Sequence, residues 1–172
     1  MNMKKAFYLL LAPLLLIGVL AFTSSNPKPK GVTEKSAALK KWEATPEGIR
    51  FKKWEASPAG KKVYASEAKV RKSIKAFSNM EGVVTSLSLP QGAKLGFGVM
   101  VKINGEDFIL AFGICTKNEV KQLQALQVND KIIIKSRGVS HAPKYAFPIL
   151  SGDYIERDQK ILYKRPPNKG GC

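Results

Sequence analysis

The sequence is poor in the residues from which most catalytic and metal sites are built. Its 172 residues include one histidine and two cysteines. These are too few for a zinc cluster, and no Ser–His–Asp or Cys–His arrangement has a supporting local motif. The glycines of Gly96-Phe97-Gly98 lack the third glycine and the helix start of a dinucleotide-binding loop. The sequence therefore predicts a protein that is not an enzyme and that uses no cofactor and no metal.

Cysteine is also too scarce for a disulfide framework of the kind that small secreted domains use. Cys172 is the last residue and follows two glycines, so a bridge to Cys115 requires the tail to fold back. We expect two free thiols or a weakly formed bridge between them.

Negative charge is the third scarcity. The chain has 13 Asp and Glu residues against 29 Lys and Arg residues, a formal net charge of +16. Residues 1–80 hold 16 of the basic and 5 of the acidic residues, so most of the excess lies in the first half. Such a segment suits anionic lipid head groups, nucleic acid or acidic polymers. A soluble, hydrated helix surface explains the charge equally well.

Only one long apolar run occurs, from Ala6 to Phe22. Lys4 and Lys5 precede it and a polar stretch follows, as in an export signal with cleavage after Ala21. A run of this length is also at the short limit of a transmembrane helix. We therefore expect residues 1–25 to be a signal peptide or a single-pass membrane anchor, and the protein to be membrane-anchored or periplasmic in the cell envelope. Lysines after the run leave a cytoplasmic-facing domain as the less favoured alternative.

Residues 26–80 read as a basic helical arm that contains a duplication. Lys40–Gly48 (KKWEATPEG) recurs twelve residues later as Lys52–Gly60 (KKWEASPAG). Thr45 and Ser57 each precede a proline, the combination that caps and begins a helix. Each copy is therefore predicted to end one helix and begin the next.

The second of these starts leads into a longer helix, predicted from Pro58 to Phe77. Val63, Val70, Ile74 and Phe77 form its apolar stripe. The stripe either packs on the following domain, which we favour, or lies on anionic lipid. The candidate residues for docking to lipid or to a protein partner are Trp42, Trp54, Lys61, Lys62, Lys69, Arg71, Lys72 and Lys75.

Residues 81–165 show the alternation of β-strands, and residues 166–172 are predicted to be a flexible tail. Asn104-Gly105 is a strong hairpin signal. A short helix is predicted from Lys117 to Leu126, and Val139 to Tyr145 is predicted to be a loop. The predicted strands span 81–89, 95–103, 107–113, 131–137 and 148–155, with a possible terminal ribbon at 160–164.

Three strands, a helix and two strands form the order of an OB-fold. The sequence therefore predicts a mainly β domain after the helical arm: a five-stranded OB-fold barrel with one short helix between strands 3 and 4. Leu126–Lys135 (LQVNDKIIIK) resembles the entry to strand four of the tRNA-anti-like OB domains, with Asn129 where glycine is usual, and Pro148–Ile155 resembles their closing strand. The resemblance implies a binding module and no catalytic residues.

OB-folds bind ligands on the face of strands two and three, between two flanking loops. The candidate ligand-binding residues are Lys94, Gly98, Met100, Lys102, Lys135, Arg137, His141, Lys144 and Tyr145. The predicted function is a non-catalytic binding module of unknown ligand, with lipid, protein or oligonucleotide as possible anionic partners. A single-stranded nucleic-acid-binding protein and an adaptor in a membrane-associated complex are the alternatives.

Overall fold

The computed structural model describes residues 30–166, with side chains from Ser36 onward. The chain divides into two compact units between Ala38 and Leu39, and the second unit contains the sheet. Three helices precede the sheet: α1 (Lys30–Glu43), α2 (Pro46–Ala56) and α3 (Pro58–Ala76). The predicted signal or anchor segment lies outside the described residues, as does most of the predicted tail.

The first copy of the duplicated sequence forms a sharp corner between α1 and α2. The Thr45 hydroxyl accepts a hydrogen bond from the Gly48 N–H at 3.2 Å and donates one to the Trp42 carbonyl at 2.7 Å. A Cβ atom on Gly48 would lie 2.3 Å from that carbonyl oxygen. Because no real side chain tolerates this distance, glycine is what allows the two helices to meet so closely.

The second copy repeats the same corner between α2 and α3. Ser57 accepts from the Gly60 N–H at 3.2 Å and donates to the Trp54 carbonyl at 2.6 Å. A Cβ atom on Gly60 would lie 2.2 Å from the Trp54 oxygen. The predicted helix starts are thus confirmed, and the duplication is one corner motif used twice.

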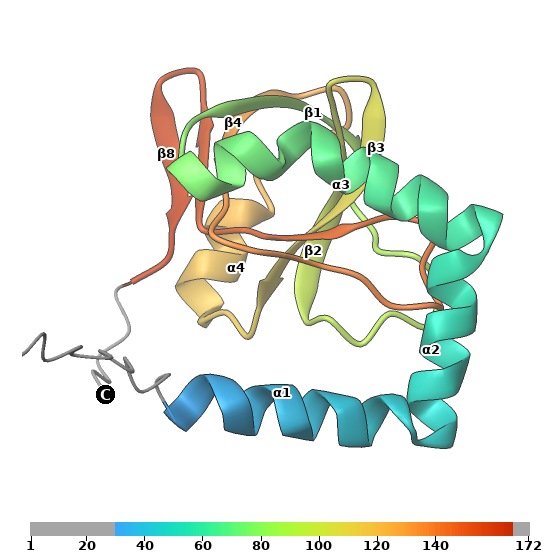
Figure 1. The fold of residues 1–172 in the computed structure, drawn as a ribbon. Coiled ribbons are helices and arrows are strands. Elements are labelled where there is room, and N and C mark those ends of the chain that lie inside the picture. Colours follow the sequence, from blue (N-terminus) through green and yellow to red (C-terminus); the bar gives the residue numbers. More distant parts are fainter. Residues whose placement is uncertain (1–29, 167–172) are drawn as a thin grey trace, which may run out of the picture. The chain divides into compact units, whose positions relative to one another are not determined.

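Within residues 30–166, eight short strands form one sheet, and the predicted helix between the third and fourth strands is confirmed as α4 (Lys117–Leu123). The order is β5-β6-β3-β2-β1-β4-β7-β8, and all neighbours are antiparallel except β3 and β6. Figure 1 shows α3 running along one side of this curved sheet and α4 next to β8. The strands are β1 (Met80–Ser86), β2 (Phe97–Ile103), β3 (Glu106–Gly113), β4 (Lys131–Lys135), β5 (Val139–Ser140), β6 (Ile149–Ser151), β7 (Tyr154–Arg157) and β8 (Lys160–Lys164).

The architecture is therefore mixed α and β with a large open sheet, and the prediction of a closed five-stranded barrel is wrong. The segment predicted to be a loop, Val139 to Tyr145, contains strand β5, and the predicted terminal ribbon at 160–164 forms β8. These two strands are the edges of the open sheet. The predicted last strand divides at Gly152 and Asp153. The Gly152 N–H donates to the backbone carbonyl of Ala111 on β3 at 2.8 Å. The Asp153 N–H donates instead to the backbone carbonyl of Lys135 on β4 at 3.2 Å. Alternation predicts strands and their faces, but it does not predict a change of pairing partner within one run.

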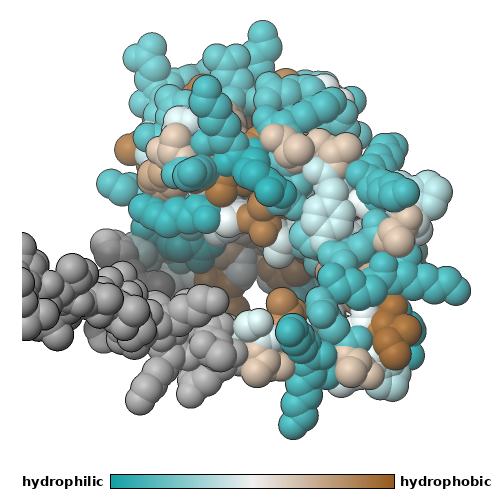
Figure 2. All heavy atoms as spheres, viewed as in Figure 1, coloured by the Kyte–Doolittle hydropathy of each residue, from teal (hydrophilic) through white to brown (hydrophobic). Residues whose placement is uncertain are grey.

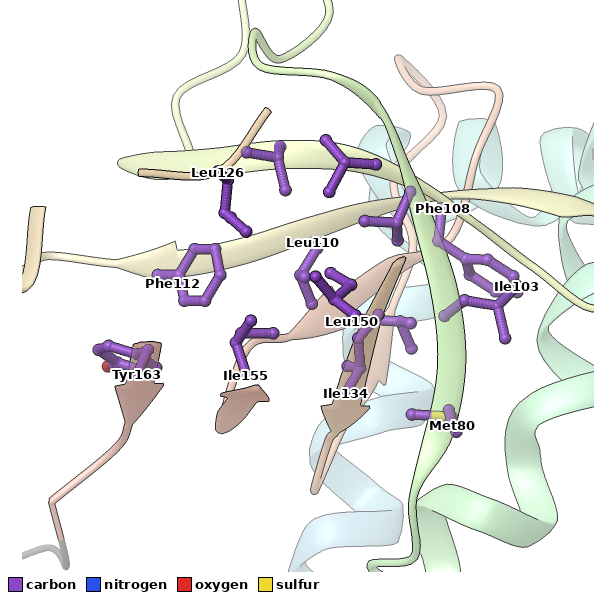
Figure 3. Packing of buried hydrophobic residues seen from close by; sticks show 14 of the residues in the cluster. Met80, Ile103, Phe108, Leu110, Phe112, Leu126, Ile134, Leu150, Ile155 and Tyr163 are labelled. Carbon is purple, nitrogen blue, oxygen red and sulfur yellow. The ribbon is translucent and has the colours of Figure 1, made fainter. Parts of the chain in front are cut away.

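The main core lies on the concave side of the sheet. In Figure 3 the labelled side chains run from Met80 and Phe108 at one end to Phe112 and Tyr163 at the other. The rings of Phe112 and Tyr163 meet edge to face, with centroids 5.1 Å apart. Side chains of β1, β2, β3, β4, β6, β7 and β8 thus share one apolar interior.

Two helices extend this core. Val70 of α3 is fully buried in it and Ile74 packs against it, so the apolar stripe of α3 packs on the domain, as favoured from the sequence. Leu123 and Leu126, from α4 and the turn after it, are also buried in the core.

A second apolar cluster covers the other face of β2 and β3. It contains buried Met100, Ile109, Tyr145 and Ile149, against which residues of the loops on either side pack. Leu95 joins this cluster, although strict alternation along 95–103 would place it on the same face as Val99 and Ile103. The intervening Gly96 adopts a left-handed conformation, with φ of 73°, which breaks the alternation.

None of the helices within residues 30–166 combines the length and the apolar character needed to cross a bilayer. The predicted transmembrane helix therefore corresponds to no described helix, and the run from Ala6 to Phe22 lies outside the described residues.

Candidate binding surface

The face on which a ligand was predicted is filled by the protein's own loops. Gly98 and Met100 are both buried. A Cβ atom on Gly98 would lie 2.9 Å from the Leu89 side chain, which shows how closely the loop between β1 and β2 approaches. Tyr145, predicted on the flanking loop, is buried in the same cluster. These three residues pack within the protein, and their contact with a ligand stays a prediction.

His141 does not face a ligand site either, because the helical arm surrounds it. Its ring lies against Phe51 and Trp54, with centroids 6.0 and 5.8 Å away, and meets Tyr64 edge to face at 4.4 Å. Its Nδ1 lies 3.4 Å from a carboxylate oxygen of buried Glu67. We call these five residues the His141 cluster; it fastens α2 and α3 to the loop after β5.

Polar contacts of α2 and α3 add to the ring contacts of the His141 cluster, and several residues predicted for docking take part in them. The Tyr64 hydroxyl donates to Glu55, and burial together with this bond raises the pKa of Tyr64. Arg71 pairs with Glu67 at 2.8 Å. Lys69 pairs with Glu106 at the start of β3. Trp54, Lys69 and Arg71 are thus engaged within the protein.

The remaining predicted cations are spread over the surface. Lys102 lies 3.9 Å from Asp107, and the Lys144 ammonium lies 4.7 Å from the centre of the Tyr145 ring. Lys94 is exposed on the loop before β2. The predicted docking residues that remain exposed without an ion-pair partner among residues 36–166 are Trp42, Lys61, Lys62, Lys72 and Lys75. The sequence-predicted residues therefore do not form one site.

Lys135 and Arg137 are the predicted ligand residues that the fold does bring together. The Arg137 guanidinium carbon lies 3.9 Å from the centre of the Phe77 ring. The Lys135 ammonium lies 5.0 Å from the centre of the Tyr154 ring and 5.9 Å from that of Phe77. Such cation–aromatic contacts are worth about 0.5–1 kcal/mol at exposed sites. Two cations are thereby held beside two rings.

Phe77 reaches this place through an unusual backbone conformation. It ends α3 in the left-handed region, with φ of 48° and ψ of 39°, and its N–H donates to the Ile74 carbonyl at 3.1 Å. A bulky residue there carries strain on the order of 1–3 kcal/mol. The helical period assigned Phe77 to the core stripe of α3, but its half-buried ring lies under Arg137 instead.

Strand register extends the surface across two more strands. Lys135 of β4 pairs with Tyr154 of β7, which pairs with Lys164 of β8. Side chains directly opposite one another across neighbouring strands are in contact range. We define the cationic–aromatic surface as Phe77, Lys135, Arg137, Tyr154 and Lys164. None of its three cations has an ion-pair partner among residues 36–166.

An open groove of about 730 Å³ adjoins this surface. The next cross-strand row on the same face, Ile133, Glu156 and Ile161, links the two, and Glu156 accepts a hydrogen bond from the Tyr154 hydroxyl. Apolar and oppositely charged side chains mix along the groove. It is lined by Glu81, Gly82, Val83, Lys102, Asn104, Gly105, Lys131, Ile132, Ile133, Glu156, Asp158 and Gln159.

The side chains of the cationic–aromatic surface offer positive charge, flat rings and apolar area, and no grouping of His, Cys, Asp or Glu within the described residues could hold a metal ion. Lys135 and Arg137 were predicted as ligand-binding residues from the sequence. Tyr154 and Lys164 join them only through strand register, and Phe77 only through the left-handed end of α3, so local patterns did not predict these three.

Comparison of the chain with protein-family models, with curated proteins and with solved structures gave no match.

Proposed function

We propose that the protein is a non-catalytic binding module, held in the cell envelope by its N-terminal segment, that binds an extended anionic partner. The observation that carries this proposal is the cationic–aromatic surface, where Arg137 and Lys135 lie beside Phe77 and Tyr154 without an ion-pair partner among residues 36–166. The strand order β3-β2-β1-β4 is that of a Greek key, which supports a relationship to OB-type binding domains.

The surface is organised before a ligand arrives. Stacking on Phe77 restricts the Arg137 guanidinium, and the adjacent strands hold Lys135, Tyr154 and Lys164 in one row. A ligand that carries repeated negative groups would contact the cations, while its flat or apolar parts would contact the rings. Pre-organisation of this kind lowers the entropic cost of binding.

Single-stranded nucleic acid is the second candidate ligand. Proteins that bind it combine cations along the backbone with aromatic rings on which bases stack. Tyr154, between Lys135 and Lys164 in the cross-strand row, supports this alternative.

Charge reversal at this surface tests the proposal. We expect the variant Lys135→Glu with Arg137→Glu to lose at least about tenfold in affinity for anionic polymers, because two charge contacts become repulsive. The probes are a labelled oligothymidine of about 16 nucleotides, within the range of one OB-type site, and polyglutamate of similar charge. Binding of the unmodified protein should weaken steeply as salt is added.

The matched control reverses two exposed lysines elsewhere, Lys94→Glu and Lys117→Glu, with the same change in net charge. If the control loses as much affinity as the surface variant, net charge explains the binding and the site is refuted. If neither probe binds at low salt, the anionic-partner proposal fails. Oligothymidine binding that Tyr154→Ala weakens, with polyglutamate binding unchanged, would select nucleic acid.

A further inference from the structure

The two copies of the duplicated corner present equivalent positions, but those of the first copy are more exposed. In the second copy, Phe51 and Trp54 lie against His141. The residues twelve positions earlier, Leu39 and Trp42, are 54% and 40% exposed. The Phe51 ring lies edge-on beside Trp42, with centroids 5.6 Å apart, but both side chains of this apolar pair stay substantially exposed.

Ile49 adds a third apolar side chain at this corner, with 59% exposure. The described residues contain seven exposed large apolar side chains, and three of them fall within positions 39–49. We call Leu39, Trp42 and Ile49 the corner patch. Figure 2 shows apolar surface beside α2, among hydrophilic side chains.

The corner itself does not require an apolar residue at the position of Ile49. The position of Ile49 in the second copy is occupied by Lys61, which is exposed, and the two corners have the same hydrogen bonds. Exposed isoleucine in the first corner is thus not explained by folding, whereas contact with an apolar medium would explain it.

The charges around the corner patch indicate the nature of that medium. Lys40, Lys41 and Lys53 are exposed and have no ion-pair partner among residues 36–166, and Arg50 pairs only with Glu47. Lysines beside exposed leucine, isoleucine and tryptophan are typical of segments that lie at the surface of anionic membranes.

We propose that the corner patch docks on the surface of an anionic lipid bilayer. This proposal rests on the proposed function, in which the N-terminal segment holds the protein at the membrane. Only residues 23–38 separate Phe22, the last residue of that segment's apolar run, from Leu39 of the corner patch. Seven residues at full extension and nine in α1 reach about 40 Å at most, which keeps the corner patch near the membrane. The patch is separate in sequence from the cationic–aromatic surface.

The two tryptophans of the chain make a direct test possible. Trp54→Phe leaves Trp42 as the only tryptophan in the full chain, which is then reconstituted in phosphatidylcholine vesicles containing phosphatidylglycerol. We expect a blue shift of Trp42 emission and strong quenching when the lipids carry brominated acyl chains. The converse variant, Trp42→Phe, should show much weaker quenching, because Trp54 lies in the His141 cluster.

Two further variants separate docking from mere proximity. Leu39→Gln with Ile49→Gln, made in the Trp54→Phe protein, should lower the ratio of docked to undocked corner on the order of tenfold or more. Leu87→Gln with Ile161→Gln removes exposed apolar side chains elsewhere and should leave quenching unchanged.

Three results would overturn the proposal: a Trp42 spectrum that stays that of a water-exposed indole, equal quenching in both double variants, or a shift that follows protein concentration and not lipid. The last would indicate a second copy as the occupant. Lys135→Glu with Arg137→Glu should leave the quenching intact, so failure of the anionic-partner proposal and failure of lipid docking are distinguishable.

Discussion

At the scale of single residues, glycine and one hydroxyl decide the geometry of the helical arm. Gly48 and Gly60 each pack against a tryptophan carbonyl that leaves no room for a Cβ atom. Thr45 and Ser57 satisfy backbone groups on both sides of each corner. The corner is therefore a local property of the duplicated sequence.

The corner glycine gives the first prediction at this scale. Gly60→Ala should destabilise the protein by about 1–3 kcal/mol, because its Cβ atom would overlap the rigid Trp54 carbonyl and the helices would have to separate. Denaturant unfolding measures the change. Gly138→Ala is the matched control, because no atom lies within 4 Å of its Cβ position; similar losses in both variants would refute the steric explanation.

Asp130 gives a pH-dependent prediction. Burial alone would raise the pKa of Asp130, but hydrogen bonds from Arg157 and from the Gln127 N–H lower it below the ordinary value. The pKa of Asp130 is lower in the folded state than in the unfolded state. Its contribution to the free energy of unfolding is therefore complete above the unfolded-state pKa and is lost as pH falls through the folded-state pKa.

We therefore expect Asp130→Asn to lower the free energy of unfolding by about 1.5–3 kcal/mol at neutral pH. The variant's free energy of unfolding should also change less as the pH falls into the acid range. Equilibrium unfolding at a series of pH values tests this. Asp158→Asn, whose side chain is 90% exposed, serves as the comparison. An Asp130→Asn profile parallel to that of the unmodified protein would count against the assignment.

At the scale of elements, the contact between the arm and the sheet domain determines what each surface can do. Val70 and Ile74 join α3 to the core, and the His141 cluster joins α2 and α3 to the loop after β5. Trp54 is used in these contacts, and Lys69 and Arg71 pair with Glu106 and Glu67, so our two proposals use the first corner and the end of α3 instead.

The His141 cluster gives the prediction at this scale. His141→Ala should speed amide hydrogen exchange in α2 on the order of tenfold or more, because it removes three ring contacts and the Glu67 contact at once. His141→Phe keeps a ring and loses only the Glu67 contact, so exchange should rise less. Unchanged exchange in the alanine variant would show that other contacts hold the arm.

At the scale of the whole molecule, positive charge is spread over the helical arm and the sheet domain, while nine of the twelve acidic residues among 36–166 form ion pairs. Glu67, Glu106, Asp130 and Asp153 pair with Arg or Lys inside the fold. The unpaired cations therefore dominate the exterior, which is why both proposals invoke anionic partners. The two proposed surfaces differ in their uncharged side chains. The cationic–aromatic surface offers aromatic rings, whereas the corner patch offers aliphatic side chains and one indole ring.

The sequence by itself determined the features that depend on near neighbours in the chain. These are the two corners, the strands from Met80 to Gly113, the hairpin at Asn104 and the helix between β3 and β4. Capping, alternation and turn preference act over a few residues, so local patterns are sufficient to predict them.

Only the tertiary structure decided which strands pair and which faces are covered. Three contacts show this: Gly98 faces the Leu89 side chain, the His141 ring lies against Trp54, and the Phe77 ring lies against Arg137. Each of them joins segments that are distant in sequence. The free energy of these contacts comes from packing among remote residues, and no local period encodes the partner.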